Sequence, residues 1–341
     1  ATKWRAPNAR TDWIPPPHPS TMSFSLPSRA AALLAVFSLS AIGTAAEEAR
    51  WYKGNLHTHS LWSDGNDYPE MIADWYKAQG YNFLALSDHN VLQEGERWLE
   101  LKAPVSIKGE VNQRGGSDVL KRYIARFGNS WVQQREVNGK QQVRLKPLAE
   151  YRVLLEEPGR FLMIPSEEVT SAWKQEKTAT EPERGGPVHI NLTNPRDFVA
   201  PAPGRTALEI MQATANTVRD QREKTGQPMF LHLNHPNFVW GVTAEELMQV
   251  HHEKFFEIYN GHPGVNNAGD ETRLGTEAMW DAILTRRLAE LKLGVMYGLG
   301  VDDSHNYHQF KLGTSNPGRG WVMVRAKHLT PESDRKSTRL N

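Results

Sequence analysis

Short apolar runs alternate with amphipathic stretches along most of the chain. Apolar runs of this length are typical of buried strands, whereas apolar positions three and four residues apart are typical of helices. The pattern predicts strands at residues 51–60, 82–87, 161–165, 188–192, 229–233, 255–259 and 294–299, with a further one at 321–324. It predicts helices from Pro69 to a stop at Gly80, and at 206–225, 244–250 and 276–291. About seven strands alternating with helices favour a single closed or nearly closed α/β barrel. A doubly wound open sheet is the alternative.

Local signals support two of these helices. Pro69 suits the first turn of a helix, and Asp67 is the expected capping residue before it. The helix over 276–291 is expected to bury one apolar face, made of Trp280, Ile283, Leu284, Leu288 and Leu291.

Residues 91–160 interrupt the alternation. They are polar and rich in Lys, Arg, Gln and Gly, with a helical stretch at 119–127 and an Asn138-Gly139 pair typical of a hairpin turn. We interpret them as an insertion. It is either a lid over the site or a solvated decoration.

The two ends of the chain differ from the rest. Residues 1–21 are polar and Pro-rich, and residues 22–46 combine Arg29, an apolar run and small residues, as in a secretory signal peptide. A buried N-terminal helix is the alternative. The mature chain is then a single domain at 47–330, exported to the periplasm or secreted, with no membrane span after the signal is removed. Residues 331–341 are expected to be an unstructured or artefactual tail.

Charge and composition exclude several classes of protein. The net charge is +1, and removing the +3 carried by residues 1–46 leaves −2 for the remainder, so no basic face for nucleic acid is expected. The chain has no cysteine, which excludes disulfides, thiolate metal sites and cysteine nucleophiles. No Walker A loop, dinucleotide fingerprint or Gly-x-Ser-x-Gly elbow is present. The sequence does not predict the oligomeric state.

Metal-ligand residues recur where predicted strands end. His57 and His59 are two residues apart, so in a strand both point to the same face. The carboxyl ends of parallel strands meet at one edge, where sites are built. The full set at such positions is His57, His59, Asp64, His89, Glu168, His189, His235, Asp303 and His305. Each alone is more often a surface or capping residue, but their recurrence predicts a site for two or three divalent ions, of manganese, zinc or iron.

The remaining histidines carry weaker predictions. His18, His251, His252 and His328 lie away from strand ends and are expected to be structural. His232 is expected in the core or behind the ligands, and His262 and His308 are loop residues that are candidates for substrate contact.

The order of these motifs resembles the PHP (polymerase and histidinol phosphatase) family. The motifs are His-x-His, Ser-Asp-Gly, Ser-Asp-His, Glu-Val-Thr, a single His, Asn-His-Pro and Asp-x-His, over residues 51–310. The resemblance implies a distorted seven-stranded (β/α)7 barrel with a two- or three-metal centre that hydrolyses a phosphate ester. It also implies that Glu168 rather than Glu167, and Asp303 rather than Asp302, is the ligand. The long insertion and the leader depart from the family's minimal pattern.

The expected reaction is hydrolysis of a small-molecule phosphate ester. Clustered divalent ions lower the pKa of a shared water and neutralise phosphate oxygens. His235 or His305 is the expected proton donor to the leaving alcohol. Arg184, Lys311 and Arg319 are candidate phosphate-binding residues, with surface solvation as their alternative. Ester, carbamate or amide hydrolysis at the same site, or metal or ligand binding without turnover, remain the competing functions.

Overall fold

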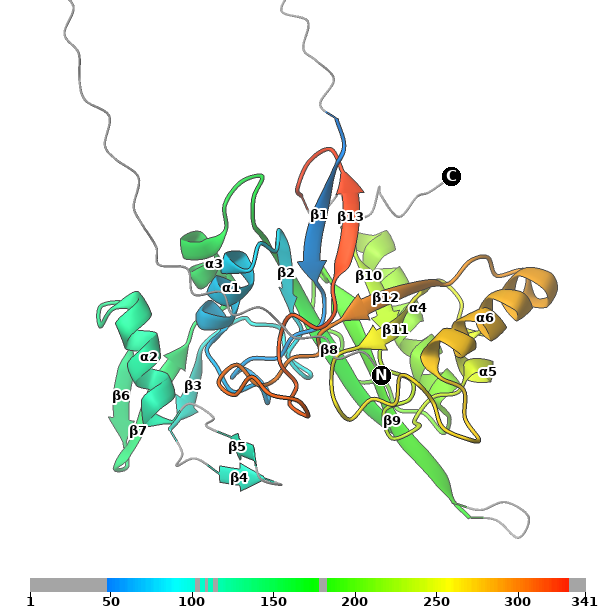
Figure 1. Ribbon diagram of the computed structural model, residues 1–341, viewed down its shortest axis with the longest axis horizontal. Helices are drawn as coiled ribbons and strands as arrows, with labels where there is room; N and C mark the ends of the chain where they lie inside the picture. The colour runs from blue at the N-terminus through cyan, green and yellow to red at the C-terminus, as the bar shows by residue number, and fades with distance from the viewer. Residues whose placement is uncertain (1–47, 102–104, 108–109, 113–115, 178–182, 331–341) are drawn as a thin grey trace, which may run out of the picture. The chain divides into compact units, whose positions relative to one another are not determined.

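The computed structural model describes residues 48–101, 105–107, 110–112, 116–177 and 183–330. The predicted leader, signal peptide and tail lie outside the described residues. Over the described residues, helices and strands alternate around a central sheet (Figure 1). In the part of the chain that the structure describes, no helix is both long and apolar enough to cross a bilayer.

The central sheet is barrel-like and nearly closed. Its strands are β1 (Arg50–Asn55), β2 (Phe83–Leu86), β8 (Leu162–Gln175), β9 (Arg184–Thr193), β10 (Phe230–Leu233), β11 (Phe255–Asn260), β12 (Tyr297–Val301) and β13 (Val322–Ala326). They are hydrogen-bonded in the order β12-β11-β10-β9-β8-β2-β1-β13. A parallel bridge between Thr58 and Ser304 joins the segments that follow β1 and β12, which draws the sheet towards closure.

This sheet departs from the expected alternation in two ways. It has eight strands rather than seven, because β13, the further strand expected at 321–324, pairs antiparallel with β1 from Arg50 to Gly54. In addition, β9 runs antiparallel to both β8 and β10. The connection at 176–183 is too short to carry a crossover helix, so β8 and β9 form a long hairpin instead of a βα unit.

The helices follow the predicted positions closely. They are α1 (Pro69–Ala78), α4 (Ala207–Thr225), α5 (Ala244–Leu247) and α6 (Thr276–Arg286), with a π-helical turn η1 (Arg287–Leu291) after α6. Thr206 caps α4 by accepting from the amide of Glu209, and Gly226 ends it with a positive φ.

Two predictions about helices were wrong in detail. Tyr68, not Asp67, occupies the N-cap of α1, and Asp67 accepts from the Tyr68 amide instead. The apolar face expected over 276–291 fails in its second half, where Leu288 and Leu291 are exposed. At that point the chain changes to the π turn, and the buried side chain is Arg287, which donates to the carbonyls of Met248 and Val250.

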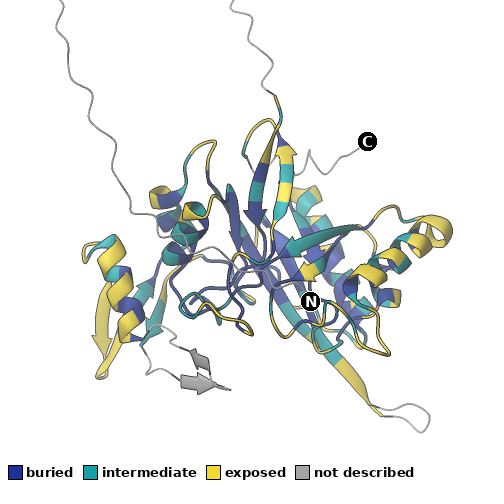
Figure 2. Cartoon of the chain, in the orientation of Figure 1, coloured by how far each residue is buried: buried dark blue, intermediate teal, exposed yellow. Residues whose placement is uncertain are grey.

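Buried residues concentrate between the sheet and its helices (Figure 2). The main apolar cluster joins β8 to β11 with α4, α5 and α6, and includes Ile190, Leu231, Phe256, Ile210 and Ile283. This packing fixes the strands whose ends carry the predicted ligands.

The insertion contains two small sheets, β3-β7-β6 and β4-β5, and two helices. Its elements are β3 (Arg97–Glu100), β4 (Val105–Ile107), β5 (Glu110–Asn112), α2 (Ser117–Phe127), β6 (Gln134–Val137), β7 (Lys140–Leu145) and α3 (Leu148–Leu155). The hairpin at Asn138-Gly139 is present, with positive φ at both residues. Tyr123 of α2 stacks on Tyr68 before α1 at 4.0 Å between ring centroids, so the insertion packs on the barrel's first helical segment. Its role as a lid stays a prediction.

Candidate metal centre

Histidine and carboxylate side chains from six strands of the sheet and the loops after them converge on one place. His57 and His59 follow β1, His89 follows β2, and Glu168 lies on β8. His189 lies within β9, His235 follows β10, and Asp303 follows β12. Glu168 and His189 are inside the β8–β9 hairpin rather than at strand ends, because that hairpin continues past the other strands. All nine predicted ligands belong to groups whose ligand atoms lie within 4.8 Å of one another.

Backbone hydrogen bonds hold the first ligands in place. The amide of Asp303 donates to the carbonyl of His57 at 3.0 Å, and the amide of His59 donates to the carbonyl of Ser304 at 2.9 Å. The segments joined by the Thr58–Ser304 bridge therefore also place His57, His59 and Asp303 side by side. Asp303 adopts a positive φ of 49°, a conformation that non-glycine residues adopt at turns and at functional sites.

The innermost group is fully buried and closely spaced. His57 Nε2 and His59 Nε2 lie 3.1 Å apart, and each is 3.2 Å from Asp303 Oδ1. Glu168 faces the same point, with Oε1 3.4 Å from His57 Nε2 and Oε2 3.3 Å from His59 Nε2.

Glu168 also reaches a second group. Its Oε2 lies 2.9 Å from His89 Nδ1, and its Oε1 lies 3.1 Å from His189 Nδ1 and 3.5 Å from His235 Nε2. One buried carboxylate therefore serves ligand groups on both sides, as a bridging ligand between two ions would.

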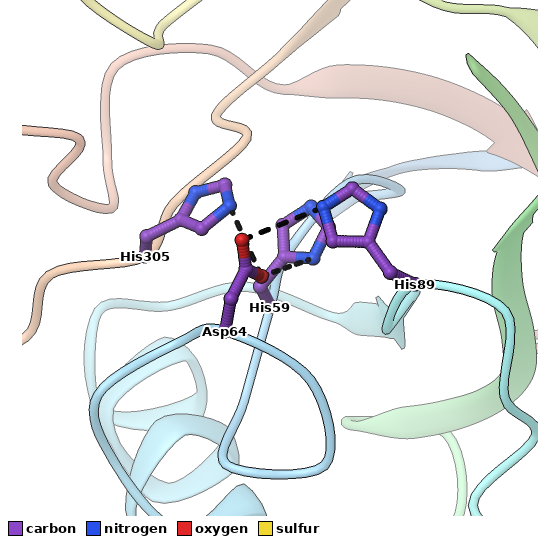
Figure 3. Close-up of side chains that lie close together, drawn as sticks. All are labelled: His59, Asp64, His89 and His305. Atoms are coloured by element: carbon purple, nitrogen blue, oxygen red, sulfur yellow. Dashed lines mark ion pairs between the residues drawn. The ribbon is translucent and has the colours of Figure 1, made fainter. Parts of the chain in front are cut away.

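A third group surrounds Asp64 (Figure 3). Its carboxylate lies 3.4 Å from His59 Nδ1, 3.5 Å from His89 Nε2 and 3.4 Å from His305 Nε2. The side chain of Asp64 is 37% exposed, so this is the most open of the three groups.

The spacing of these atoms fits bound divalent cations. Ligand atoms about 2.1 Å from an ion lie roughly 3.0 to 3.4 Å apart in octahedral or tetrahedral coordination. Although both atoms face other groups of the cluster, the buried Glu168 Oε2 and His189 Nδ1 make no hydrogen bond of normal geometry to the described residues, and buried polar atoms are otherwise almost always satisfied. Imidazole nitrogens and carboxylate oxygens are the ligands that zinc, iron and manganese accept.

The charges of the cluster also fit bound cations. Burial alone would raise the pKa of Glu168, but His89, His57 and His189 lower it well below its usual range. Burial would likewise raise the pKa of Asp303, and His57 and its neighbours lower it. Burial would lower the pKa of His305, yet Asp64 and Asp303 raise it to about 9. The carboxylates are thus ionised in a buried site and require positive charge beside them, either from histidinium or from metal ions.

Glu257 on β11 is a member of the site that the sequence analysis missed. Its Oε1 accepts from His57 Nδ1 at 2.6 Å and from His232 Nε2 at 3.1 Å. Its Oε2 accepts from the His235 amide and from Asn260 Nδ2, each at 2.8 Å. Glu257 therefore orients His57 so that Nε2 faces the other ligands. A lone acid inside the apolar run 255–259 was the available signal.

In each of the two adjacent acidic pairs, at 167–168 and 302–303, only one side chain faces the cluster. Glu167 points away from the cluster, and its Oε1 accepts from the Val199 amide at 2.8 Å. Asp302 accepts from Tyr76 Oη and from the amides of Gly318, Arg319 and Gly320, so it fixes the loop behind the site. Glu168 and Asp303 are the members that face the other ligands.

The three candidate phosphate-binding residues are not members of the ligand groups. Arg184 pairs with Gln175 at the far end of the hairpin, about 17 Å along β9 from His189 at the usual strand rise. Lys311 is exposed in the loop after His308. Arg319 donates to the carbonyls of Gly261 and Lys311, so its guanidinium joins two loops.

Three further histidines, His262, His308 and His232, lie close to the cluster. The ring of His262 lies 5.4 Å from that of His305, and its Nδ1 accepts from the Gly264 amide at 3.1 Å. His308 Nε2 lies 2.9 Å from the Asn66 carbonyl, which places His308 in the loop beside Asp64. His232 supports Glu257, as expected of a residue behind the ligands. His18 lies outside the described residues.

No protein-family model matches this sequence, and no curated protein matches it. Among solved structures, the chain is similar to a two-domain protein from Bacteroides vulgatus that contains a predicted PHP-like metal-dependent phosphoesterase. The identity is 15%, the TM-score is 0.40, and 85% of this chain and 62% of the other are covered. The chain thus spans about three fifths of that protein's length.

The chain is also similar to PsfC from Pseudomonas syringae, at 13% identity and a TM-score of 0.33, with 85% of this chain and 97% of the other covered. Because both TM-scores lie below 0.5, the functional interpretation rests on the side chains of this chain.

Proposed function

We propose that this protein is a metal-dependent hydrolase of the PHP type that acts on a phosphate ester. The observation that carries the proposal is the convergence of nine histidine and carboxylate side chains, with ligand atoms 2.9 to 3.5 Å apart around Glu168 and Asp64. A purely structural metal site is normally closed by four ligands, whereas this set exceeds that number and is open at Asp64.

The chemistry follows from the proposed ligands. Two or three divalent ions, of manganese, zinc or iron, would activate water and neutralise phosphate oxygens. His57, His59, Glu168 and Asp303 would hold the buried part of the centre. Asp64, His89 and His305 would hold the open part, where a substrate can approach.

The predicted proton donors, His235 and His305, both direct a ring nitrogen towards carboxylates of the cluster. His305 donates its Nδ1 proton to the Asp303 carbonyl, so its Nε2, which faces Asp64, is the nitrogen that could bind an ion. His235 directs Nε2 towards Glu168 and Asp303. Both would then serve as metal ligands. Since His262 accepts at Nδ1 from Gly264, its proton is on Nε2, and we assign this N–H as a hydrogen-bond donor to a substrate oxygen.

Hydrolysis of three chromogenic esters tests the proposal. We would assay 4-nitrophenyl phosphate, bis(4-nitrophenyl) phosphate and 4-nitrophenyl acetate with added manganese or zinc, and use a His57→Ala/His59→Ala double variant as the control. Phosphate-ester turnover that disappears in the double variant and with chelator is the expected result. Turnover of the acetate alone would move the reaction to carbonyl substrates. Metal binding without any turnover would favour a binding protein.

Export is part of the proposal and has its own test. The support is the sequence of residues 22–46, with a basic residue, an apolar run and small residues at its end. Expression of the full chain in a bacterial host, followed by mass spectrometry of the periplasmic fraction, should find a chain that starts near Glu47. A chain that stays in the cytoplasm with residues 22–46 intact would contradict export.

A further inference from the structure

One edge of the metal cluster is aromatic rather than charged. Phe238, three residues after His235, is half-buried and packs against three histidines from different elements. Its ring centroid lies 5.2 Å from that of His235, 6.0 Å from that of His189 and 6.1 Å from that of His262. A ligand at the cluster would therefore meet an apolar ring on this side.

The segment that carries Phe238 is fixed on both sides. The Phe238 amide donates to the His235 carbonyl at 2.8 Å, and Phe238 forms an antiparallel bridge with Val265, three residues after His262. Trp240 lies under Arg273, with the guanidinium 3.8 Å from the ring centroid. The ring of Phe238 is thus pre-positioned, so a ligand would lose little entropy by ordering it.

The backbone beside Phe238 is strained. Val239 and Trp240 have φ values of 50° and 56°, in the left-handed region that β-branched and bulky residues rarely adopt. Val239 is also 63% exposed, so burial of its own side chain does not compensate for the strain. Strain of this kind persists at binding sites, where the surrounding contacts maintain it. Here its structural consequence is the position of Phe238 against the histidines.

We propose that Phe238 is a specificity-determining residue that selects substrates whose phosphate carries an aromatic or other planar apolar group. The inference rests on the proposed function, because it assumes that the phosphate lies at the metal cluster. With the phosphate there, an aryl group on the β10 side would stack on, or meet edge-on, the ring of Phe238. A small alkyl or polyol group would gain little from that contact.

Direct binding of two non-hydrolysable probes tests this. We would titrate the manganese-loaded full chain with phenylphosphonate and with methylphosphonate by calorimetry. Phenylphosphonate should bind more tightly to the wild type, and Phe238→Ala should weaken it roughly three- to tenfold, the range of an aromatic contact, while methylphosphonate affinity stays unchanged. Phe238→Tyr, which keeps the ring, should retain the preference and guards against misfolding of the alanine variant.

The matched control is Trp51→Ala. Trp51 is also an exposed aromatic residue, but it lies near the start of β1, about 20 Å along the strand from His57. It should change neither affinity. Equal binding of the two phosphonates by the wild type, an equal loss of both in Phe238→Ala, or binding of neither probe would overturn the inference. By contrast, the protein could bind phenylphosphonate with the predicted Phe238 dependence and yet not hydrolyse phenyl phosphate. That result would refute the hydrolase proposal but support the role of Phe238 in binding.

Discussion

At the scale of single residues, the site depends on carboxylates in two positions, inside the cluster and behind the histidines. Glu168 and Asp303 face the ring nitrogens from within the cluster, whereas Glu257 bonds the far nitrogen of His57 from behind. All four of Glu257's hydrogen bonds come from the ligands or from the residues beside them. An outer carboxylate of this kind fixes the tautomer of the ligand and raises its basicity.

We therefore predict that Glu257→Gln weakens metal binding about 10- to 100-fold without abolishing the fold. The amide keeps the size of the side chain but loses the charge that holds His57. Competition against a chelating indicator dye measures the affinity. Glu245→Gln, on the exposed face of α5, is the control and should bind like the wild type. Wild-type affinity in Glu257→Gln would show that Glu257 only packs behind the site.

Sequence analysis singled out the candidate ligands more readily than the residues that orient them, such as Glu257. His57, His59, His89 and Asp303 stand in short polar motifs directly after apolar runs, so pattern alone singles them out. Glu257 stands inside such a run, where alternation along the strand turns it inward, and its role depends on two histidines from other strands. The role of Arg184, Lys311 and Arg319 in phosphate binding stays a prediction. Their loops were placed near the face by sequence order, but the length of the hairpin and the hydrogen bonds of Arg319 depend on tertiary structure.

At the scale of elements, the β8–β9 hairpin couples the ligands to the aromatic edge. Trp173 of β8 donates to the carbonyl of Gly241 at 2.9 Å, just after Trp240. Gly186 of β9 and Gly241 approach so closely that a Cβ on Gly186 would lie 2.6 Å from Gly241 Cα. The absence of side chains at both positions lets the 236–241 loop lie on the hairpin.

Gly241→Ala should therefore displace this loop. Its added Cβ would overlap the carbonyl of Pro187, a backbone atom that cannot rotate away. We predict a loss of about 1 to 3 kcal/mol in the free energy of unfolding, the usual cost of overpacking, with weaker binding of phenylphosphonate. Chemical denaturation and calorimetry measure the two effects.

Gly300→Ala is the matched control, because its Cβ would meet the nearest backbone atom at an ordinary 3.4 Å. It should leave both properties near the wild-type values. Wild-type stability in Gly241→Ala would mean that the loop is free to move away from the hairpin.

The same hairpin marks the limit of sequence analysis for the fold. Strands β2, β10 and β11 and helix α4 were predicted within a few residues, because apolar periods and the residues that bound α4, Thr206 and Gly226, are local signals. The antiparallel direction of β9 was not predicted. Strand direction depends on whether the connecting residues can form a crossover, and the connection at 176–183 carries no apolar pattern that would have distinguished a loop from a short helix.

At the scale of the whole molecule, stability is linked to the charge of the cluster. Without metal, Asp64 and Glu168 require protonated histidines, and the neighbouring carboxylates raise the pKa of His89 to about 11 and of His305 to about 9 against the opposing effect of burial. A histidine whose folded-state pKa is raised contributes stability that is fully present below its unfolded pKa of 6.5. That stability is lost as the pH rises through the folded-state values.

The chelated protein should therefore lose melting temperature as the pH rises from about 6.5 towards 11, whereas the metal-loaded protein should change less, because bound ions replace the protons. Thermal melts across this range, with chelator and with manganese, measure both curves. Parallel curves would indicate that the cluster's charge does not control stability.

The most direct test of the central claim is the metal content of the purified chain. Inductively coupled plasma mass spectrometry of the wild type, Glu168→Gln and Glu167→Gln compares neighbouring acids, of which only Glu168 faces the ligands. We predict two or three divalent ions for each wild-type and Glu167→Gln chain, and at least one fewer for Glu168→Gln. Wild-type protein that stays metal-free after incubation with manganese, zinc and iron, or equal metal content in all three proteins, would contradict the metal centre.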